Sequence, residues 1–215
     1  MKPIKIMKYR KVLLVCGILS SLLYVGTDIL AAMKWEAYSY TSQGISELMA
    51  IGAPTRPLLV ALFTIYDVLI VAFAFGILVT DSPKRSLRFT GIVLIVYGIL
   101  GQVGLVFFPM HVRGSVGTIT DPMHAALTAV IVLLILLSVG FGANVNGKWF
   151  RFYSICTILI LFLFGAWASM DGPRIAANLP TPWMGVKERI NVYGYMLWVM
   201  VLAILALRME AGKTT

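Results

Sequence analysis

The chain has 215 residues, of which 60% are hydrophobic and only 13% are charged, and its mean hydropathy is +0.90. Soluble domains are about half apolar and about a quarter charged, so this composition excludes a soluble globular protein. It predicts an all-α integral membrane protein. The net charge of +9 is distributed one-sidedly along the chain. We therefore interpret it as a sign of membrane topology and expect no nucleic-acid partner.

Six apolar segments follow one another with short connections, and a helix that crosses a bilayer needs about 20 such residues. The first follows the basic residues 1–11, and we expect it to be an uncleaved signal anchor because it exceeds a signal peptide in length and carries Asp28. Nothing is left over for a soluble domain, so residues 1–215 are expected to form a single membrane domain. The six predicted spans are residues 12–33, 57–79, 89–108, 122–142, 152–170 and 190–207.

Two connections and one span carry further local signals. Residues 42–51 are predicted to form a short helix at the membrane interface. Asp121 and Pro122 suit the cap and the first turn of the fourth span. The third span contains small residues such as Gly98 and Gly101, which let a neighbouring helix approach closely. That neighbour could belong to the same chain or to the second copy of a homodimer.

Lysine and arginine divide unequally between the two sides of the six spans. Twelve lie in the two terminal segments and in the connections 80–88 and 143–151, whereas six lie in the other three loops. The positive-inside rule therefore predicts that both termini are cytoplasmic. The loops 34–56, 109–121 and 171–189 are expected to face outward from a plasma membrane, such as a bacterial inner membrane.

Most polar residues of the spans fall near their outer ends, as a rise of about 1.5 Å per helical residue shows. This distribution predicts a polar pocket that is open to the extracytoplasmic side. Asp67 is the exception, since it lies near the bilayer midplane, where an unpaired charge costs at least a few kcal/mol. The residues expected at the outer level are Asp28, Gln102, His124, Asp171, Glu188 and Arg189.

The first functional hypothesis is that this pocket binds a lipid or a lipid-linked anionic ligand, with membrane lipids as partners. It rests on the outer arginines, because a guanidinium group can grip a phosphate or carboxylate at two points. Alternatively, the same charges form ion pairs that hold the loops, and the protein is an accessory or structural subunit. The predicted ligand-binding residues are Ser46, Glu47, Arg113, Asp171, Arg174, Glu188 and Arg189.

A third hypothesis is a metal-dependent hydrolase of a membrane lipid. A catalytic zinc ion needs three protein ligands and an open position, where it activates water. His124, His111 and Asp28 are the candidate ligands, and His124, Asp121 and Asp28 are the candidate catalytic residues. His124 is favoured over His111, because it stands on a helix and can face Asp28.

Several short motifs resemble one known family. They are Asp28 in the first span, Ser46-Glu-Leu followed by Gly52-Ala-Pro, Phe108-Pro109, Asp121-x-x-His124, and Gly185-x-x-Glu-Arg189. Together they resemble the six-helix bacterial membrane proteins of domain of unknown function 998, which implies six spans and an uncharacterised role. A more distant likeness connects the chain with seven-helix metal-dependent lipid hydrolases, the alkaline ceramidase and progestin-receptor-like group. The chain departs from that group because it lacks a His-x-x-x-His pair and a seventh span.

Overall fold

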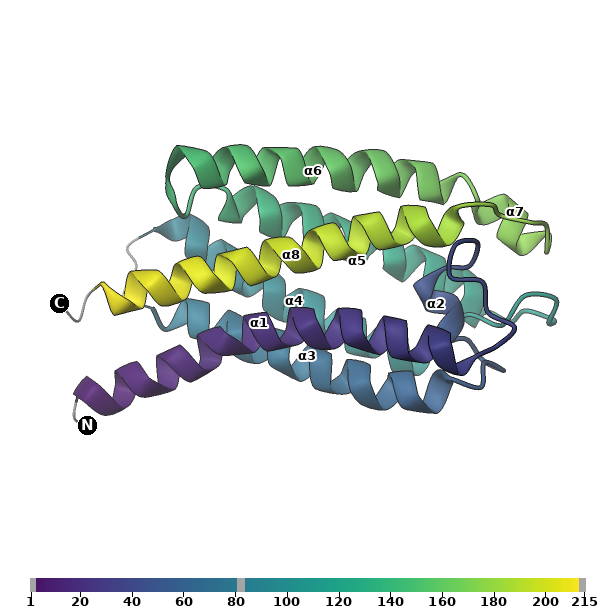
Figure 1. Cartoon of the computed structure of the whole chain (residues 1–215), viewed down its shortest axis with the longest axis horizontal. Coiled ribbons are helices and arrows are strands. Elements are labelled where there is room, and N and C mark those ends of the chain that lie inside the picture. Colours follow the sequence, from purple (N-terminus) through teal and green to yellow (C-terminus); the bar gives the residue numbers. More distant parts are fainter. Residues whose placement is uncertain (1–2, 81–83, 213–215) are drawn as a thin grey trace.

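The computed structural model describes residues 3–80 and 84–212, which fold into a bundle of helices (Figure 1). Six helices are long and apolar enough to cross a membrane. Over the described ranges the only β-type pairing is an isolated bridge between Ile51 and His111. The prediction of an all-α protein with six spans is therefore confirmed. The helices are α1 (Pro3–Lys34), α2 (Ile45–Leu48), α3 (Arg56–Leu78), α4 (Arg85–Phe107), α5 (Thr120–Gly142), α6 (Gly147–Ser169), α7 (Gly172–Ala176) and α8 (Met184–Ala211).

The long helices extend beyond the spans predicted from hydropathy. The fifth begins at Gly147 instead of residue 152, and the last begins at Met184 instead of residue 190. Both extensions contain charged residues, which lower the local hydropathy but do not prevent a helix from continuing. In the first loop, the predicted interfacial helix over residues 42–51 is a single turn, α2.

The bundle has two distinct ends. Helix α1 packs between α3 and α8, α4 packs between α3 and α5, and α6 packs on α8. Both termini lie at one end, which we call the terminal end, whereas α2 and α7 lie at the opposite end, the loop end (Figure 1). The connections 35–55, 108–119 and 170–183 meet at the loop end.

A buried aromatic cluster packs α8 against α6. Trp198 of α8 is 0% exposed and stacks on Tyr195 and Phe150. Its indole N–H donates a hydrogen bond of 3.0 Å to the hydroxyl of Ser154 on α6. A buried indole that satisfies its donor in this way fixes α8 against α6.

The buried residues of α5 and α6 lie toward the terminal end of each helix. The buried residues of α5 lie in its last third, and those of α6 lie in its first two thirds, although both helices continue to the loop end. Beyond them, toward the loop end, the residues of both helices are half-buried or exposed, and some of each line a cavity described below. These buried residues are Ile135, Ser138, Val139 and Gly142 on α5, and Phe150, Ser154, Thr157 and Leu161 on α6.

Gly98 of the glycine-rich third span shows that one of its neighbouring helices belongs to the same chain. A Cβ atom at this position would lie 2.9 Å from Val71 Cγ2 and 3.3 Å from the carbonyl oxygen of Asp67, both on α3. The missing side chain therefore lets α4 approach α3 within the same chain. The homodimer stays a prediction.

Candidate functional site

The first loop, residues 35–55, folds back over the loop end, and we call it the cap. Its Ile51 N–H donates to the carbonyl of Met110 at 2.7 Å, and the Val112 N–H donates to the Ile51 carbonyl at 3.1 Å. The Thr55 hydroxyl closes the cap on itself by donating to the Leu48 carbonyl at 2.6 Å. The cap and the 108–119 loop are thus joined by backbone hydrogen bonds.

Arg189 and Asp28 form a bidentate ion pair between α8 and α1. Arg189 Nε and Nη2 donate to the two carboxylate oxygens of Asp28 at 2.8 and 2.9 Å, and the Tyr193 hydroxyl donates to Asp28 as well. The Asp28 residue is 0% exposed and Arg189 only 4%. Two parallel charge-assisted hydrogen bonds away from water fix the register of α1 against α8.

The remaining donors of Arg189 hold the cap. Its Nη2 donates to the Tyr38 hydroxyl at 2.8 Å, and its Nη1 donates to the carbonyls of Tyr40 at 2.7 Å and Gln43 at 3.2 Å. The guanidinium carbon lies 3.6 Å from the centre of the Tyr40 ring. Burial raises the pKa of the Tyr38 hydroxyl, which stays protonated and donates to the carbonyls of Gln43 and Gly44. All three nitrogens of Arg189 are thus engaged within the protein.

We expect the substitution Gly185→Ala to destabilise this junction by about 1–3 kcal/mol, the usual cost of overpacking. A Cβ atom at Gly185 would collide with the carbonyl oxygens of Tyr40 and Gln43, and it would lie 2.8 Å from Arg189 Nη1. Thermal unfolding in a mild detergent measures the effect. Gly194→Ala on the same helix is the control, because no atom lies within 4 Å of a Cβ there. An equal melting temperature for the two variants would contradict the close approach.

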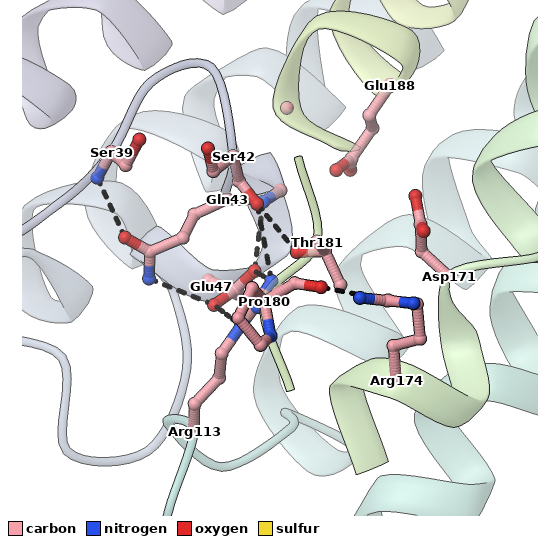
Figure 2. Close-up of polar contacts among 12 residues, drawn as sticks. Ser39, Ser42, Gln43, Glu47, Arg113, Asp171, Arg174, Pro180, Thr181 and Glu188 are labelled. Carbon is pink, nitrogen blue, oxygen red and sulfur yellow. Dashed lines mark hydrogen bonds and ion pairs between the residues drawn. The ribbon is translucent and has the colours of Figure 1, made fainter. Parts of the chain in front are cut away.

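A second bidentate ion pair joins the cap to the 108–119 loop. Arg113 Nε and Nη2 each donate to a carboxylate oxygen of Glu47 at 2.7 Å (Figure 2). Glu47 also accepts the side-chain amide of Gln43 and the backbone N–H of Gly44, both at 3.0 Å. Since Glu47 is only 2% exposed, this pair is a second anchor of the cap.

A third ion pair is formed by Lys187 on α8 and Asp171 just before α7. The ammonium group donates to Asp171 Oδ2 and lies 5.1 Å above the centre of the Trp167 ring. Both residues are buried, at 4% and 8% exposure. This pair ties the end of α6 to the start of α8.

Glu188 differs from its neighbours because no cation pairs with it among the described residues. One carboxylate oxygen accepts the backbone N–H of Ile45 at 3.0 Å. Figure 2 shows no contact between Glu188 and the side chains of Arg113 or Arg174. Glu188 is half-buried and lines the cavity described below.

The two histidines have different partners. His111 Nδ1 donates to Asp121 Oδ2 at 2.8 Å, and the backbone N–H groups of His111 and Thr118 donate to the same carboxylate at 2.8 Å each. His124 Nδ1 donates to the Phe108 carbonyl at 3.0 Å. Asp121 thus orients His111, whereas Asp28 is occupied by Arg189 and Tyr193. Over residues 3–80 and 84–212, no three His, Cys, Asp or Glu side chains group as a metal site, and zinc stays a prediction.

A cavity of about 1170 Å³ opens at the loop end between the cap, the 108–119 loop, α1, α3, α4, α5, α6 and α8. Its walls are mainly apolar side chains such as Leu127, Ile131 and Leu161. Phe162 of α6 also lines the cavity and is 65% exposed, so it marks a rim on the flank of the bundle between α5 and α6. Ligand pockets commonly span about 300–1,000 Å³, so this cavity can hold a whole small amphiphile.

The structure divides the residues predicted from the sequence into two groups. Eight line the cavity: Ser46, Glu47, Asp67, His111, Arg113, Asp121, His124 and Glu188. Five lie outside its lining: Asp28 and Arg189 in their ion pair, Asp171 with Lys187, the exposed Arg174, whose Nε donates to the Pro180 carbonyl, and Gln102, whose side-chain oxygen is buried without a hydrogen bond in the described part of the chain.

Two features of the site were not predicted from the sequence. Lys187 lay in a segment that we expected to be a loop, although its place beside Glu188 and Arg189 could have indicated a charged first turn of the last helix. The cavity also has an aromatic wall from α1, α3, α4 and α8, formed by Tyr24, Phe63, Tyr66, Tyr97 and Tyr195. No local motif connects these four helices, so only the fold could reveal it.

Comparisons with known proteins give one result. The family model described as "Protein of unknown function (DUF998)" matches residues 18–205. No curated protein and no solved structure matches the chain. The matched range includes all the short motifs that the resemblance rested on, from Asp28 to Arg189. With six apolar helices and a family match over most of its length, this multi-pass membrane protein belongs to the DUF998 family.

Proposed function

We propose that the protein binds a membrane lipid or a similar amphiphile in the cavity at its loop end. The observation that carries this proposal is the cavity of about 1170 Å³, with apolar walls and polar groups near its mouth. Phe162 on α6 and Ala129 on α5 line the cavity and are exposed on the surface of the bundle. An apolar chain could lie between them while the polar group of the ligand lies inside the cavity.

The orientation in the membrane is part of this proposal. Most lysine and arginine residues belong to the terminal end, so the positive-inside rule favours cytoplasmic termini in a plasma membrane. The cavity mouth then faces the extracytoplasmic side. Lipids of the outer half of the bilayer would be the ones within reach.

The state of the cations near the cavity mouth decides whether they are available to bind the predicted anionic head group. Arg113, Lys187 and Arg189 each hold a buried carboxylate within the protein. An anion could bind them only by displacing these partners, which costs several kcal/mol for each buried pair. Arg174 is exposed but lies outside the cavity lining. We therefore base the proposal on the apolar chain of the ligand.

The two other hypotheses remain open beside this one. The His111–Asp121 pair lines the cavity and holds an imidazole in one orientation, which is an arrangement that a hydrolase of a bound lipid could use. The accessory-subunit hypothesis needs only the three ion pairs that fix the loops. Neither accounts for the volume of the cavity as directly as lipid binding does.

Filling the cavity tests the proposal. We expect Ala129→Trp to lower the amount of lipid that co-purifies with the protein by about tenfold, because the large indole takes up the space of the chain. Mass spectrometry of extracted lipid per mole of protein measures this. The matched control is Val130→Trp, since Val130 is the next residue of α5, is 44% exposed and does not line the cavity. Equal lipid content in both variants and the wild type would refute the proposal.

A further inference from the structure

Two carboxyl groups that line the cavity form no ion pair with the described residues. Three cations of the loop end, the half-buried Arg113 and the buried Lys187 and Arg189, each have a carboxylate partner. Two further carboxylates line the cavity, those of Asp67 and Glu188, and neither has a cationic partner in the described part of the chain. The cavity therefore holds two carboxyl groups that could pair with a cation of the ligand.

Of the two carboxyl groups, Asp67 gives the stronger indication of a ligand site. It lies in the middle of α3, is 7% exposed, and has no hydrogen-bond partner among the described residues. Its side chain lies against Gly101 of α4, where a Cβ atom would come within 3.0 Å of Oδ1. A carboxyl group at this depth in a membrane is costly unless it binds a partner, and such residues mark ligand or ion sites. The partner that the protein lacks can come from the ligand.

Five aromatic rings line the same cavity as Asp67. Tyr24 stacks on Phe63 at 4.7 Å between ring centres and meets Tyr66 edge-on at 5.0 Å. The Tyr66 and Tyr97 hydroxyls are hydrogen-bonded at 2.8 Å, and Tyr97 meets Tyr195 edge-on at 5.5 Å. All five rings line the cavity. Aromatic faces attract organic cations, and cages of aromatic rings are the usual binding sites of quaternary ammonium groups.

We infer that the polar group of the ligand is a cation, a protonated or quaternary ammonium group, which pairs with Asp67 inside the aromatic wall formed by Tyr24, Phe63, Tyr66, Tyr97 and Tyr195. Glu188 attracts the same cation nearer the mouth, and the apolar chain lies between α5 and α6. This inference rests on the proposed function, because it assigns the chemistry of the ligand that the cavity holds. It replaces the anionic head group that the outer arginines had suggested.

The carboxylate and the aromatic rings both favour a cationic ligand, for a physical reason. An ammonium ion in a poorly hydrated cavity loses water, and a carboxylate together with ring faces replaces that loss. A phosphate would instead meet two carboxylates and would be repelled. An alcohol of equal chain length would be neither attracted nor repelled by charge.

Three probes with the same chain separate these possibilities. The purified full-length protein is mixed with hexadecyltrimethylammonium, hexadecanol or hexadecyl phosphate, and the bound fraction is measured by native mass spectrometry. We expect the ammonium probe to bind at least about tenfold more tightly than the other two. In Asp67→Asn the preference over hexadecanol should fall to about twofold or less, while hexadecanol binding is retained. Glu36→Gln, which removes an exposed acid outside the cavity lining, is the matched control.

The outcomes distinguish the inference from the proposed function. If the wild type binds all three probes equally, the cavity holds amphiphiles but the cation inference is wrong. If the phosphate probe binds best, the inference is wrong and the anionic ligand is restored. If no probe binds, the proposed function itself fails. If Glu188→Gln removes the preference and Asp67→Asn does not, the assignment to Asp67 is overturned. The comparison of the three probes on the wild type does not depend on the folding of any variant.

Discussion

Replacing Arg189 with alanine is expected to destabilise the protein by about 3–5 kcal/mol, the usual cost of removing one partner of a buried ion pair. The variant leaves the carboxylate of Asp28 at 0% exposure with only the Tyr193 hydroxyl as a donor. It also removes the hydrogen bonds that Arg189 makes to Tyr38, Tyr40 and Gln43. Thermal or denaturant unfolding in a mild detergent measures the loss.

Two comparisons identify the cause of that loss. Arg174→Ala removes an exposed arginine of the same end, whose Nε bonds only the Pro180 carbonyl, and surface changes of this kind usually stay within about 0.5 kcal/mol. The double variant Asp28→Asn with Arg189→Gln should regain part of the stability, because it buries no charge. An unfolding free energy of Arg189→Ala within about 1 kcal/mol of the wild type would show that Asp28 is not held as a charge.

The six spans could be predicted because hydropathy depends on composition over a long window, and the helices have enough apolar residues. The start of α8 could not be predicted in this way. Lys187, Glu188 and Arg189 make the segment look like a polar loop, yet in the fold Lys187 and Arg189 are neutralised by Asp171 and Asp28. Hydropathy scores each charged residue separately, whereas in the fold the two charges of an ion pair neutralise each other.

The depth of each polar residue could be predicted, but not its partner. A rise of about 1.5 Å per residue places residues along the helix axis and says nothing about the direction in which the side chain points. Asp28 and His124 were expected at the same level and were therefore candidates for each other. In the structure, Asp28 faces Arg189, and Asp121 faces His111 because the 108–119 loop turns two backbone N–H groups toward it.

Replacing Arg113 with alanine is expected to release the cap while the rest of the bundle stays folded. Glu47, which is 2% exposed, would keep only the amide of Gln43 and the N–H of Gly44 as donors. Truncating one partner of a buried, hydrogen-bonded charge pair costs about 2–5 kcal/mol. Because the pair joins two loops and no long helix, this cost falls on local opening and not on global unfolding.

Hydrogen–deuterium exchange resolves the two kinds of opening. The amides of Ile51 and Val112, which join the cap to the 108–119 loop, should exchange about 30-fold faster or more, since about 1.4 kcal/mol corresponds to tenfold. The amides of α8 around Trp198, which is 0% exposed at the other end, should not change. Uniform acceleration in both regions would mean that Arg113 supports the whole fold. No acceleration at Ile51 would mean that the backbone hydrogen bonds alone hold the cap.

Arg113→Ala also tests whether opening of the cap changes access to the cavity. Gly44, Ser46, Glu47 and Met49 of the cap line the cavity near its mouth, so an open cap widens the path to Glu188 and to Asp67 behind it. If the cap retains the ligand, Arg113→Ala should speed ligand release more than it slows entry. If the ligand enters between α5 and α6 alone, both rates should stay near those of the wild type. Arg113, which the sequence suggested as a ligand contact, is therefore expected to affect the ligand through Glu47, the carboxylate that it holds.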